Sequence, residues 1–292
     1  MDGIEGKEIE NYEEPNYSIN QPERIASEQP GTGCIVGADP KMIEVFRTIN
    51  LLAERRDVPI LIRGDTGTGK DLVAQALHYN AKDDDRHSRP YGIVNCSAIP
   101  SELLEATLFG HEEGAYTGAH RSRTGIVRHS HKGTLFLDEI GDMSSNLQAK
   151  ILRMIETGEI RRVGSDVLDH VDVRIISATN KNLENMMKKG EFREDLYHRL
   201  NVMSIELPTL AERPGDIPLI TSYLLGLEAQ YFDGKELEVS AEASQMLQSN
   251  PWPGNIRELK NVLKRATILS NGETILPEHL RLNPGPEQVD YK

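Results

Sequence analysis

The sequence predicts an α/β fold in which a parallel sheet carries helices on both faces, followed by a smaller all-helical domain. Three observations support this prediction. A glycine-rich loop follows the apolar run 59–63, short apolar runs alternate with helical patterns between residues 34 and 208, and no strand pattern persists after Leu210. Alternation of strands and helices is typical of a parallel sheet, because the crossover between parallel strands usually contains a helix.

The elements expected from these patterns fall into two groups. In the first domain, apolar runs predict strands at 59–63, 91–95, 134–138 and 171–178. Helical periodicity in the same domain predicts helices at 42–52, 69–81 and 144–156. In the second domain it predicts helices at 217–231, 241–249 and 255–270. The expected division of the chain is a flexible acidic tail or linker at 1–33, the α/β domain at 34–208, a helical lid domain at 209–283 and a short tail at 284–292.

Composition narrows the class of protein. The 292 residues carry a formal charge of −13, which argues against a chain that binds nucleic acid with its whole surface, so any DNA contact must be local. The only two cysteines, Cys34 and Cys96, have no metal-ligand spacing. So low a cysteine count predicts a protein of the reducing cytoplasm, without a disulfide framework. No apolar run approaches the ~20 residues that span a bilayer, so we expect a cytoplasmic protein without a membrane segment.

The loop after the first apolar run has the form of a phosphate cradle. Its G-x-x-x-x-G-K spacing lets backbone N–H groups turn toward phosphates while Lys70 reaches the β and γ oxygens, at the N-terminus of a helix. Asp71 stands where most such loops carry the Ser or Thr ligand of Mg²⁺, and a carboxylate could still hold that metal, through water if not directly. The predicted nucleotide-binding residues are Gly64, Asp65, Thr66, Gly67, Thr68, Gly69, Lys70, Asp71 and Leu72.

Two adjacent acids end the apolar run 134–138, which has the form of a Walker B strand. Asp138 would hold Mg²⁺, and Glu139 would orient and deprotonate the attacking water. Hydrolysis of a nucleoside triphosphate rests mostly on such positioning and on charge stabilisation. The alternative is a strand that is merely capped by solvated acids.

Between the second strand and these acids lies a segment in which one aromatic is flanked by small residues: Gly114, Ala115, Tyr116, Thr117, Gly118 and Ala119. An exposed aromatic at a loop tip suits partner contact, although composition alone leaves equally open a turn whose Tyr116 packs inward. The segment, GAYTGA, resembles the GAFTGA signature of the central AAA+ domain of bacterial enhancer-binding proteins, the sigma-54-dependent transcriptional activators.

The resemblance runs from about Ile35 to Leu282 over several ordered motifs. It implies ATP and Mg²⁺ as cofactors and an ATPase ring, commonly a hexamer, that remodels the closed promoter complex of sigma-54 RNA polymerase. By that similarity Tyr116 and Thr117 engage sigma-54, and DNA is reached indirectly or through a domain absent from this chain. Two alternatives remain open: a nucleotide-regulated AAA+ binding module that does not activate sigma-54, and a kinase acting on a small acceptor.

The resemblance also implies roles for single polar residues. Asn95 matches a switch asparagine that exchanges hydrogen bonds with Glu139. Asn180 matches the sensor I position, which senses the γ-phosphate or positions water, and Arg257 matches sensor II, which reaches the phosphates bound by the same subunit. Without the family, an asparagine at the end of a strand is more often a cap or turn residue.

Two arginines six residues apart, Arg193 and Arg199, match arginine fingers that the family supplies to the nucleotide of the neighbouring subunit. Judged without the family, they are the solvated face of a helix with acidic neighbours as ion-pair partners. Val36 and Gly37 match the segment that lies against adenine in the family.

The chain departs from the family before its Walker B strand. The family usually has an aromatic-acid pair and then two glycines, whereas Val127-Arg128 and Lys132-Gly133 stand here. The region is basic and could suit promoter DNA or an acidic partner, with a solvated surface as the alternative. Its basic residues are His120, Arg121, Arg123, Arg128, His129, His131 and Lys132. We expect no metal site at His129 and His131, because no cysteine or acid lies at a suitable ligand spacing from them.

Overall fold

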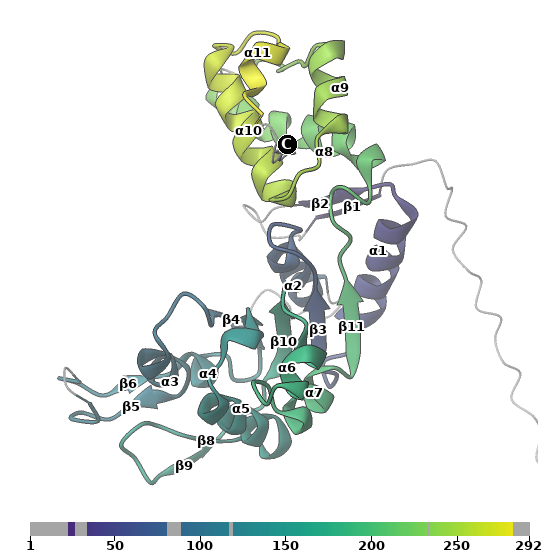
Figure 1. Cartoon of the computed structure of the whole chain (residues 1–292). Helices are drawn as coiled ribbons and strands as arrows, with labels where there is room; N and C mark the ends of the chain where they lie inside the picture. The colour runs from purple at the N-terminus through teal and green to yellow at the C-terminus, as the bar shows by residue number, and fades with distance from the viewer. Residues whose placement is uncertain (1–22, 27–33, 81–88, 117–118, 233, 283–292) are drawn as a thin grey trace, which may run out of the picture.

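The computed structural model describes residues 23–26, 34–80, 89–116, 119–232 and 234–282 (Figure 1). A central parallel sheet forms the body of the molecule, with a helical domain at one end and a lobe of helices and short hairpins at the other (Figure 1). The predicted fold class, an α/β domain followed by a helical lid, is confirmed.

The central sheet has five parallel strands in the order β11-β3-β10-β7-β4. Their bounds are β3 Ile60–Arg63, β4 Tyr91–Asn95, β7 Thr134–Asp138, β10 Arg174–Thr179 and β11 Met203–Glu206. The prediction for β10 began three residues early, because Val171 closes a neighbouring hairpin through its N–H to Gly158 O. The sequence analysis missed β11, a short edge strand in which only Ile205 is buried.

Alternate residues of the strands face two separate cores, as the twofold side-chain period of a strand requires. Ile60 and Ile62 face the core beneath α1 and α2, whereas Leu61 faces the core beneath α3, α5 and α7. The helices of this domain are α1 Pro40–Ala53, α2 Lys70–Tyr79, α3 Ser101–Phe109, α4 Ile126–His129, α5 Ser145–Thr157, α6 Leu183–Lys188 and α7 Glu194–Leu200.

The lid domain packs around the single tryptophan. Trp252 is 1% exposed and its indole N–H donates to Leu247 O at 2.7 Å, so it is a core anchor. The lid helices are α8 Ile217–Glu228, α9 Ala241–Ser249, α10 Asn255–Leu269 and α11 Pro277–Leu280. Short 3₁₀ turns are η1 Ile140–Asp142, η2 Pro214–Asp216 and η3 Ala229–Tyr231. Within the ranges given above, every helix is too short or too polar to cross a bilayer.

Among the described residues, three two-stranded antiparallel pairs lie outside the central sheet. In one of them β1 Glu23–Ala26, from the stretch expected to be a tail or linker, pairs with β2 Cys34–Gly37. The other pairs are β5 Gly110–His111 with β6 Arg123–Thr124, and β8 Glu159–Arg161 with β9 Leu168–His170. Both lie in the lobe farthest from the lid (Figure 1).

Candidate active site

The predicted site residues come together where the parallel strands end. The glycine-rich loop follows β3, Asn95 ends β4, Asp138 ends β7, and Asn180 follows β10. Because parallel strands all end at the same edge of a sheet, segments far apart in the sequence meet here. The edge also faces the lid domain, since the N-terminus of α10 contacts the loop.

The phosphate loop has the backbone that its glycines were expected to permit. Gly67 and Gly69 have φ angles of 82° and 101°, in the left-handed region. A Cβ at Gly67 would also lie 2.3 Å from Gly254 O, so only glycine fits. Lys70 is 6% exposed, and its ammonium donates to Gly64 O at 2.9 Å. The lysine therefore lies folded under the loop, at the start of α2.

Glu139 is oriented toward this lysine. Its Oε1 lies 3.4 Å from Lys70 Nζ, and its Oε2 accepts the backbone N–H of Asn180 at 3.1 Å. Glu139 itself has φ 51° and ψ 51°, a sparsely populated conformation that the surrounding contacts must hold. The Asn180 side chain donates to Thr66 Oγ1 at 3.0 Å, so one residue links the acid to the phosphate loop.

Asn95 contacts Asp138 in this structure, which differs from the expectation that it contacts Glu139. Its Nδ2 donates to Asp138 Oδ2 at 2.8 Å, because the two residues are paired in register on β4 and β7. Its Oδ1 accepts the N–H of Ser97 at 3.0 Å, so the amide also caps a turn. Burial and the charge of Glu139 raise the pKa of Asp138, and Lys70 partly offsets this rise.

The donor set fits Mg²⁺, which prefers carboxylate and water oxygens. Asp71 lies exposed in the first turn of α2, and its charge contributes to the raised pKa of Asp138, so the two acids are within electrostatic reach. Across the described ranges, no three His, Cys, Asp or Glu side chains gather as a preformed metal cluster.

A cavity of about 460 Å³ adjoins the phosphate loop and lies between the two domains. Its predicted wall residues include Val36 from β2 and Arg257 from α10. The sequence analysis missed the lid residues that also line it, among them Ile220, Tyr223 and Lys260. The sequence placed these residues on lid helices, but it placed many residues that do not line the cavity there too.

The lid touches the phosphate loop directly through a residue that the sequence analysis did not single out. Asn255 is 2% exposed, and its side chain donates to Thr66 O at 3.0 Å and accepts Leu210 N–H at 2.7 Å. The N–H groups of Ile256 and Arg257 point at Gly67 O, at 3.0 and 3.4 Å. The N-terminus of α10 therefore contacts the tip of the phosphate loop directly.

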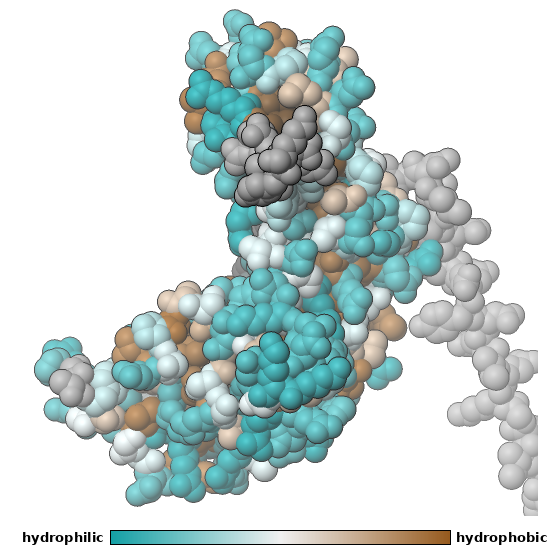
Figure 2. Space-filling view, in the orientation of Figure 1, coloured by the Kyte–Doolittle hydropathy of each residue, from teal (hydrophilic) through white to brown (hydrophobic). Residues whose placement is uncertain are grey.

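Arg193 and Arg199 lie on the surface at α7, where each pairs with an acid of its own chain. Arg193 forms a two-pronged contact with Asp195 at 2.9 and 2.6 Å, and Arg199 Nε lies 3.2 Å from Glu156 Oε1. The surface over α6 and α7 is strongly hydrophilic (Figure 2). These contacts are those of a solvated helix face, and the finger role remains a prediction.

The described residues of the GAYTGA segment, Gly114, Ala115, Tyr116 and Ala119, lie in the connection between β5 and β6. Gly114 N–H donates to Ala119 O at 2.8 Å, and Ala119 N–H donates to Tyr116 O at 2.9 Å. Tyr116 is 37% exposed and lies edge-on to His111, with ring centroids 5.1 Å apart. The predicted contact residues Thr117 and Gly118 lie outside the described residues.

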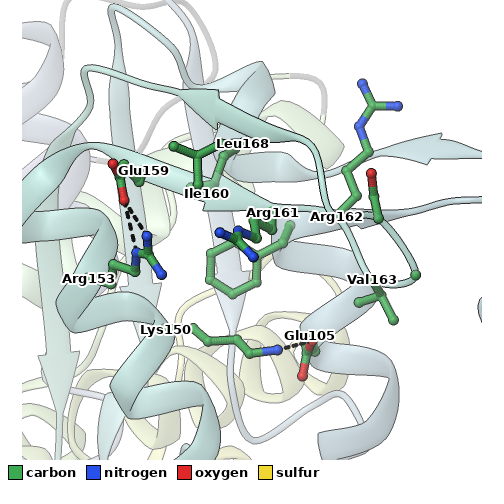
Figure 3. Close-up of a pocket in the computed structure, with 12 residues that line it drawn as sticks. Glu105, Lys150, Arg153, Glu159, Ile160, Arg161, Arg162, Val163 and Leu168 are labelled. Carbon is green, nitrogen blue, oxygen red and sulfur yellow. Dashed lines mark hydrogen bonds and ion pairs between the residues drawn. The ribbon is translucent and has the colours of Figure 1, made fainter.

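The second hairpin supports the base of the GAYTGA hairpin. Glu112 N–H donates to Val163 O at 3.0 Å, and Arg162 pairs with Glu112 at 3.2 Å. Under the second hairpin lies a cleft of about 310 Å³, which Figure 3 shows with the ion pairs of Lys150 with Glu105 and of Arg153 with Glu159 at its rim. This cleft is separate from the cavity at the phosphate loop.

Part of the unusual basic segment is paired with acids. Arg128 contacts Asp169 of β9 at 3.2 Å, and Lys132 contacts Asp172 at 2.7 Å. The departure from the family pattern thus connects the segment before β7 to the second hairpin and to the start of β10. Arg121 and Arg123 remain exposed beside the GAYTGA turn.

Since a lysine-bearing loop follows one parallel strand, paired acids follow another, and a helical lid contacts the loop, the fold and the site define an ATPase of the AAA+ class. Family models agree: the sigma-54 interaction domain matches residues 35–206, and the AAA+ ATPase lid domain matches residues 211–289. The chain belongs to the sigma-54 interaction domain family.

Relatives share this domain over much of their length. The Nif-specific regulatory protein of Azotobacter vinelandii is 47% identical over 82% of this chain and 45% of its own length. The DNA-binding transcriptional regulator NtrC of Klebsiella pneumoniae is 42% identical over 91% of this chain and 56% of its own. The crystal structure of NtrX from Brucella abortus with ADP has a TM-score of 0.76 at 36% identity, over 84% of this chain and 55% of that one. The chain thus spans about half the length of the relatives it matches.

Proposed function

We propose that the chain is an ATP-hydrolysing activator of sigma-54 RNA polymerase, which couples hydrolysis to remodelling of the closed promoter complex. One observation carries the proposal: the β5–β6 hairpin, whose connection contains the GAYTGA segment, belongs to the same α/β domain as the nucleotide site, and the chain runs to it from Asn95 of β4 through α3. The cytoplasm is the compartment that this activity requires. DNA would be reached indirectly, or through a domain other than the α/β domain and the lid domain.

In this proposal Lys70 and the loop N–H groups bind the phosphates of ATP, while Glu139 orients and deprotonates the attacking water. Asp138 with Asp71 would hold Mg²⁺, which would supply charge neutralisation for the bound phosphates. Lys70 must exchange its contacts with Gly64 O and Glu139 for phosphate oxygens, which releases Glu139 toward water. Burial and the charges of Glu139 and Asp71 all raise the pKa of Asp138, and a bound cation would favour its ionised form.

The site needs a second copy of the chain in this proposal. Arg193 and Arg199 lie outside the cavity of their own subunit, and their exposure on α7 suits a role at the nucleotide of a neighbour in a ring, commonly a hexamer. Each arginine must then leave its acid, Asp195 or Glu156. Turnover per chain should rise with protein concentration.

The test is a sizing assay of this chain with purified sigma-54 in three states: without nucleotide, with ADP, and with ADP plus aluminium fluoride and Mg²⁺. We expect a complex in the third state alone, because that analogue mimics the transferring phosphoryl group. A Tyr116→Ala variant should bind the analogue and form rings but lose the complex. Rings that bind the analogue without binding sigma-54 would overturn the proposal in favour of a nucleotide-regulated binding module.

A further inference from the structure

Behind the phosphate loop, a polar cluster joins the root of the loop to α7. Arg63 ends β3 and directly precedes Gly64. Its Nη2 lies 2.7 Å from Glu184 Oε1 on α6 and 3.0 Å from Tyr197 Oη on α7. These are charge-assisted contacts, which are stronger and better directed than neutral hydrogen bonds.

Tyr197 is the centre of the cluster. Its hydroxyl donates to Glu184 Oε1 at 2.7 Å and accepts from Asn201 Nδ2 at 2.8 Å, while the Arg63 guanidinium lies 5.8 Å from its ring centroid. The hydrogen bond from Arg63 lowers the pKa of Glu184 to about 2, so the acid stays charged at neutral pH. The cluster therefore fixes one side of a seven-residue helix.

The helix that the cluster holds is the one that presents the two surface arginines. Arg193 is the N-cap residue of α7 and Arg199 lies in its last turn, two residues after Tyr197. The start of α7 is held separately, because buried Gln148 accepts the Arg193 N–H at 2.8 Å. A shift of Tyr197 would thus turn α7 about its anchored start.

The cluster does not serve the nucleotide cavity directly. Arg63, Glu184 and Tyr197 are all absent from its lining, although Arg63 adjoins the loop. Within the part of the chain that the structure describes, Arg63 Nε and Glu184 Oε2 are buried without a hydrogen-bond partner. The cluster is therefore not saturated and has room to exchange contacts when the loop moves.

We propose that Arg63, with Glu184 and Tyr197, positions the arginines of α7, so that the root of one subunit's phosphate loop sets the pose of the fingers it offers to the next subunit. This inference rests on the proposed function, since it requires Arg193 and Arg199 to act in trans. Arg63 is then a positioning residue that acts on a nucleotide bound by another chain.

The test uses mixed rings of two subunit types. The acceptor carries Arg193→Ala with Arg199→Ala and keeps its phosphate loop, and the donor carries Lys70→Ala and keeps its fingers. Neither hydrolyses ATP alone, and the mixture should recover turnover. Arg63→Met added to the donor should lower the mixed turnover about tenfold, since small misplacements of catalytic groups cost up to about 10²-fold. The same change in the acceptor should alter turnover less than about twofold.

Two further variants protect the test against misfolding. Tyr197→Phe removes a single hydroxyl and should act in the donor in the same direction, while Arg63→Lys should restore part of the turnover. Lys132→Met, which breaks an exposed ion pair at the far end of β7, is the matched control and should change nothing.

The outcomes separate the two claims. Failure of the unmodified mixture to hydrolyse ATP would remove the finger assignment, and this inference with it. Recovery of turnover with an Arg63→Met effect confined to the acceptor would overturn only the inference, and would make Arg63 a support of its own nucleotide site.

Discussion

The polar residues at the two ends of strands β4, β7 and β10 have different kinds of bonding partner. At their carboxyl ends, β4, β7 and β10 lead to Asn95, Asp138 and Asn180 of the candidate site. At their amino ends they begin with Tyr91, Thr134 and Arg174, which belong to a buried structural cluster. Both ends hold polar and ionisable groups, but the partners of those groups differ in kind.

At the amino ends, backbone carbonyl groups stabilise the buried charge of Arg174. Arg174 is 5% exposed and donates to three carbonyls: Leu52 O and Ala53 O at the end of α1, and Leu77 O near the end of α2. One guanidinium thus satisfies the C-termini of two helices, where cations are favoured. Burial lowers the pKa of Arg174 to about 10, which leaves it charged at neutral pH.

At the carboxyl ends, the charged groups also contact other side chains, which can rotate away. Lys70 contacts Glu139, and Asn95 contacts Asp138, each through rotatable bonds. A ligand can displace such partners, whereas it cannot displace the end of a helix. At the amino end three backbone carbonyls therefore hold one buried charge in place, whereas at the carboxyl end Lys70 and Glu139 also hold each other through side chains that a ligand can separate.

The largest expected effect is on hydrolysis at the carboxyl end. Glu139→Gln should lower the turnover of ATP by about 10³-fold, or about 4 kcal/mol of barrier, because a glutamine cannot deprotonate water. Binding of a fluorescent ATP analogue should persist, and the unfolding midpoint should stay the same or rise, since one of two adjacent negative charges is removed. Substantial hydrolysis by this variant would remove Glu139 from its proposed role.

Arg174→Met should affect stability and leave chemistry intact. We expect a loss of about 3 kcal/mol in the free energy of unfolding, because three buried carbonyls lose their donor. Urea titration measures this loss. The matched control is Arg128→Met, whose ion pair with Asp169 is exposed and should be worth less than about 1 kcal/mol. Equal losses in the two variants would mean that the buried Arg174 contributes no more to stability than the exposed ion pair of Arg128.

The pH dependence of stability should report on His78 at the amino end. Burial lowers the pKa of His78 from 6.5 to about 4, while its Nδ1 lies 2.9 Å from Thr134 Oγ1. As pH falls from 6.5 toward 4, the unfolded chain binds a proton that the folded chain does not bind, so the free energy of unfolding falls by about 3 kcal/mol. His78→Gln should remove this part of the slope in unfolding at several pH values. Parallel curves for the two proteins would refute it.

The smallest of these effects should lie between the domains. Asn255→Ala removes the contacts with Thr66 O and Leu210 N–H, so the lid should hold the phosphate loop less firmly. We expect about tenfold weaker binding of ATP, about 1.4 kcal/mol, with turnover at saturation within about threefold. A change in turnover without a change in affinity would instead place Asn255 in the chemical step.

Sequence patterns located the reactive groups better than their contacts. The loop at 64–70 and the acids at 138–139 follow directly from spacing, and the structure brings them within 3.4 Å of one another through Lys70 and Glu139. The partner of Asn95 could not be predicted, because it depends on the register between β4 and β7. Arg63, Gln148 and Asn255 gave no sequence signal, since the partners that connect them to α7 or to the phosphate loop lie more than forty residues away in the chain.

The sequence by itself determined the fold class, the phosphate loop, the acidic strand and the GAYTGA segment, because these depend on local periodicity and on fixed spacing between neighbours. Only the tertiary structure decided which polar groups face each other across strands and domains. It decided that Asn95 contacts Asp138, that Arg174 caps two helices and that Arg63 joins the phosphate loop to α7. Such contacts form between residues distant in sequence, so strand register and helix packing must be set before a partner is defined.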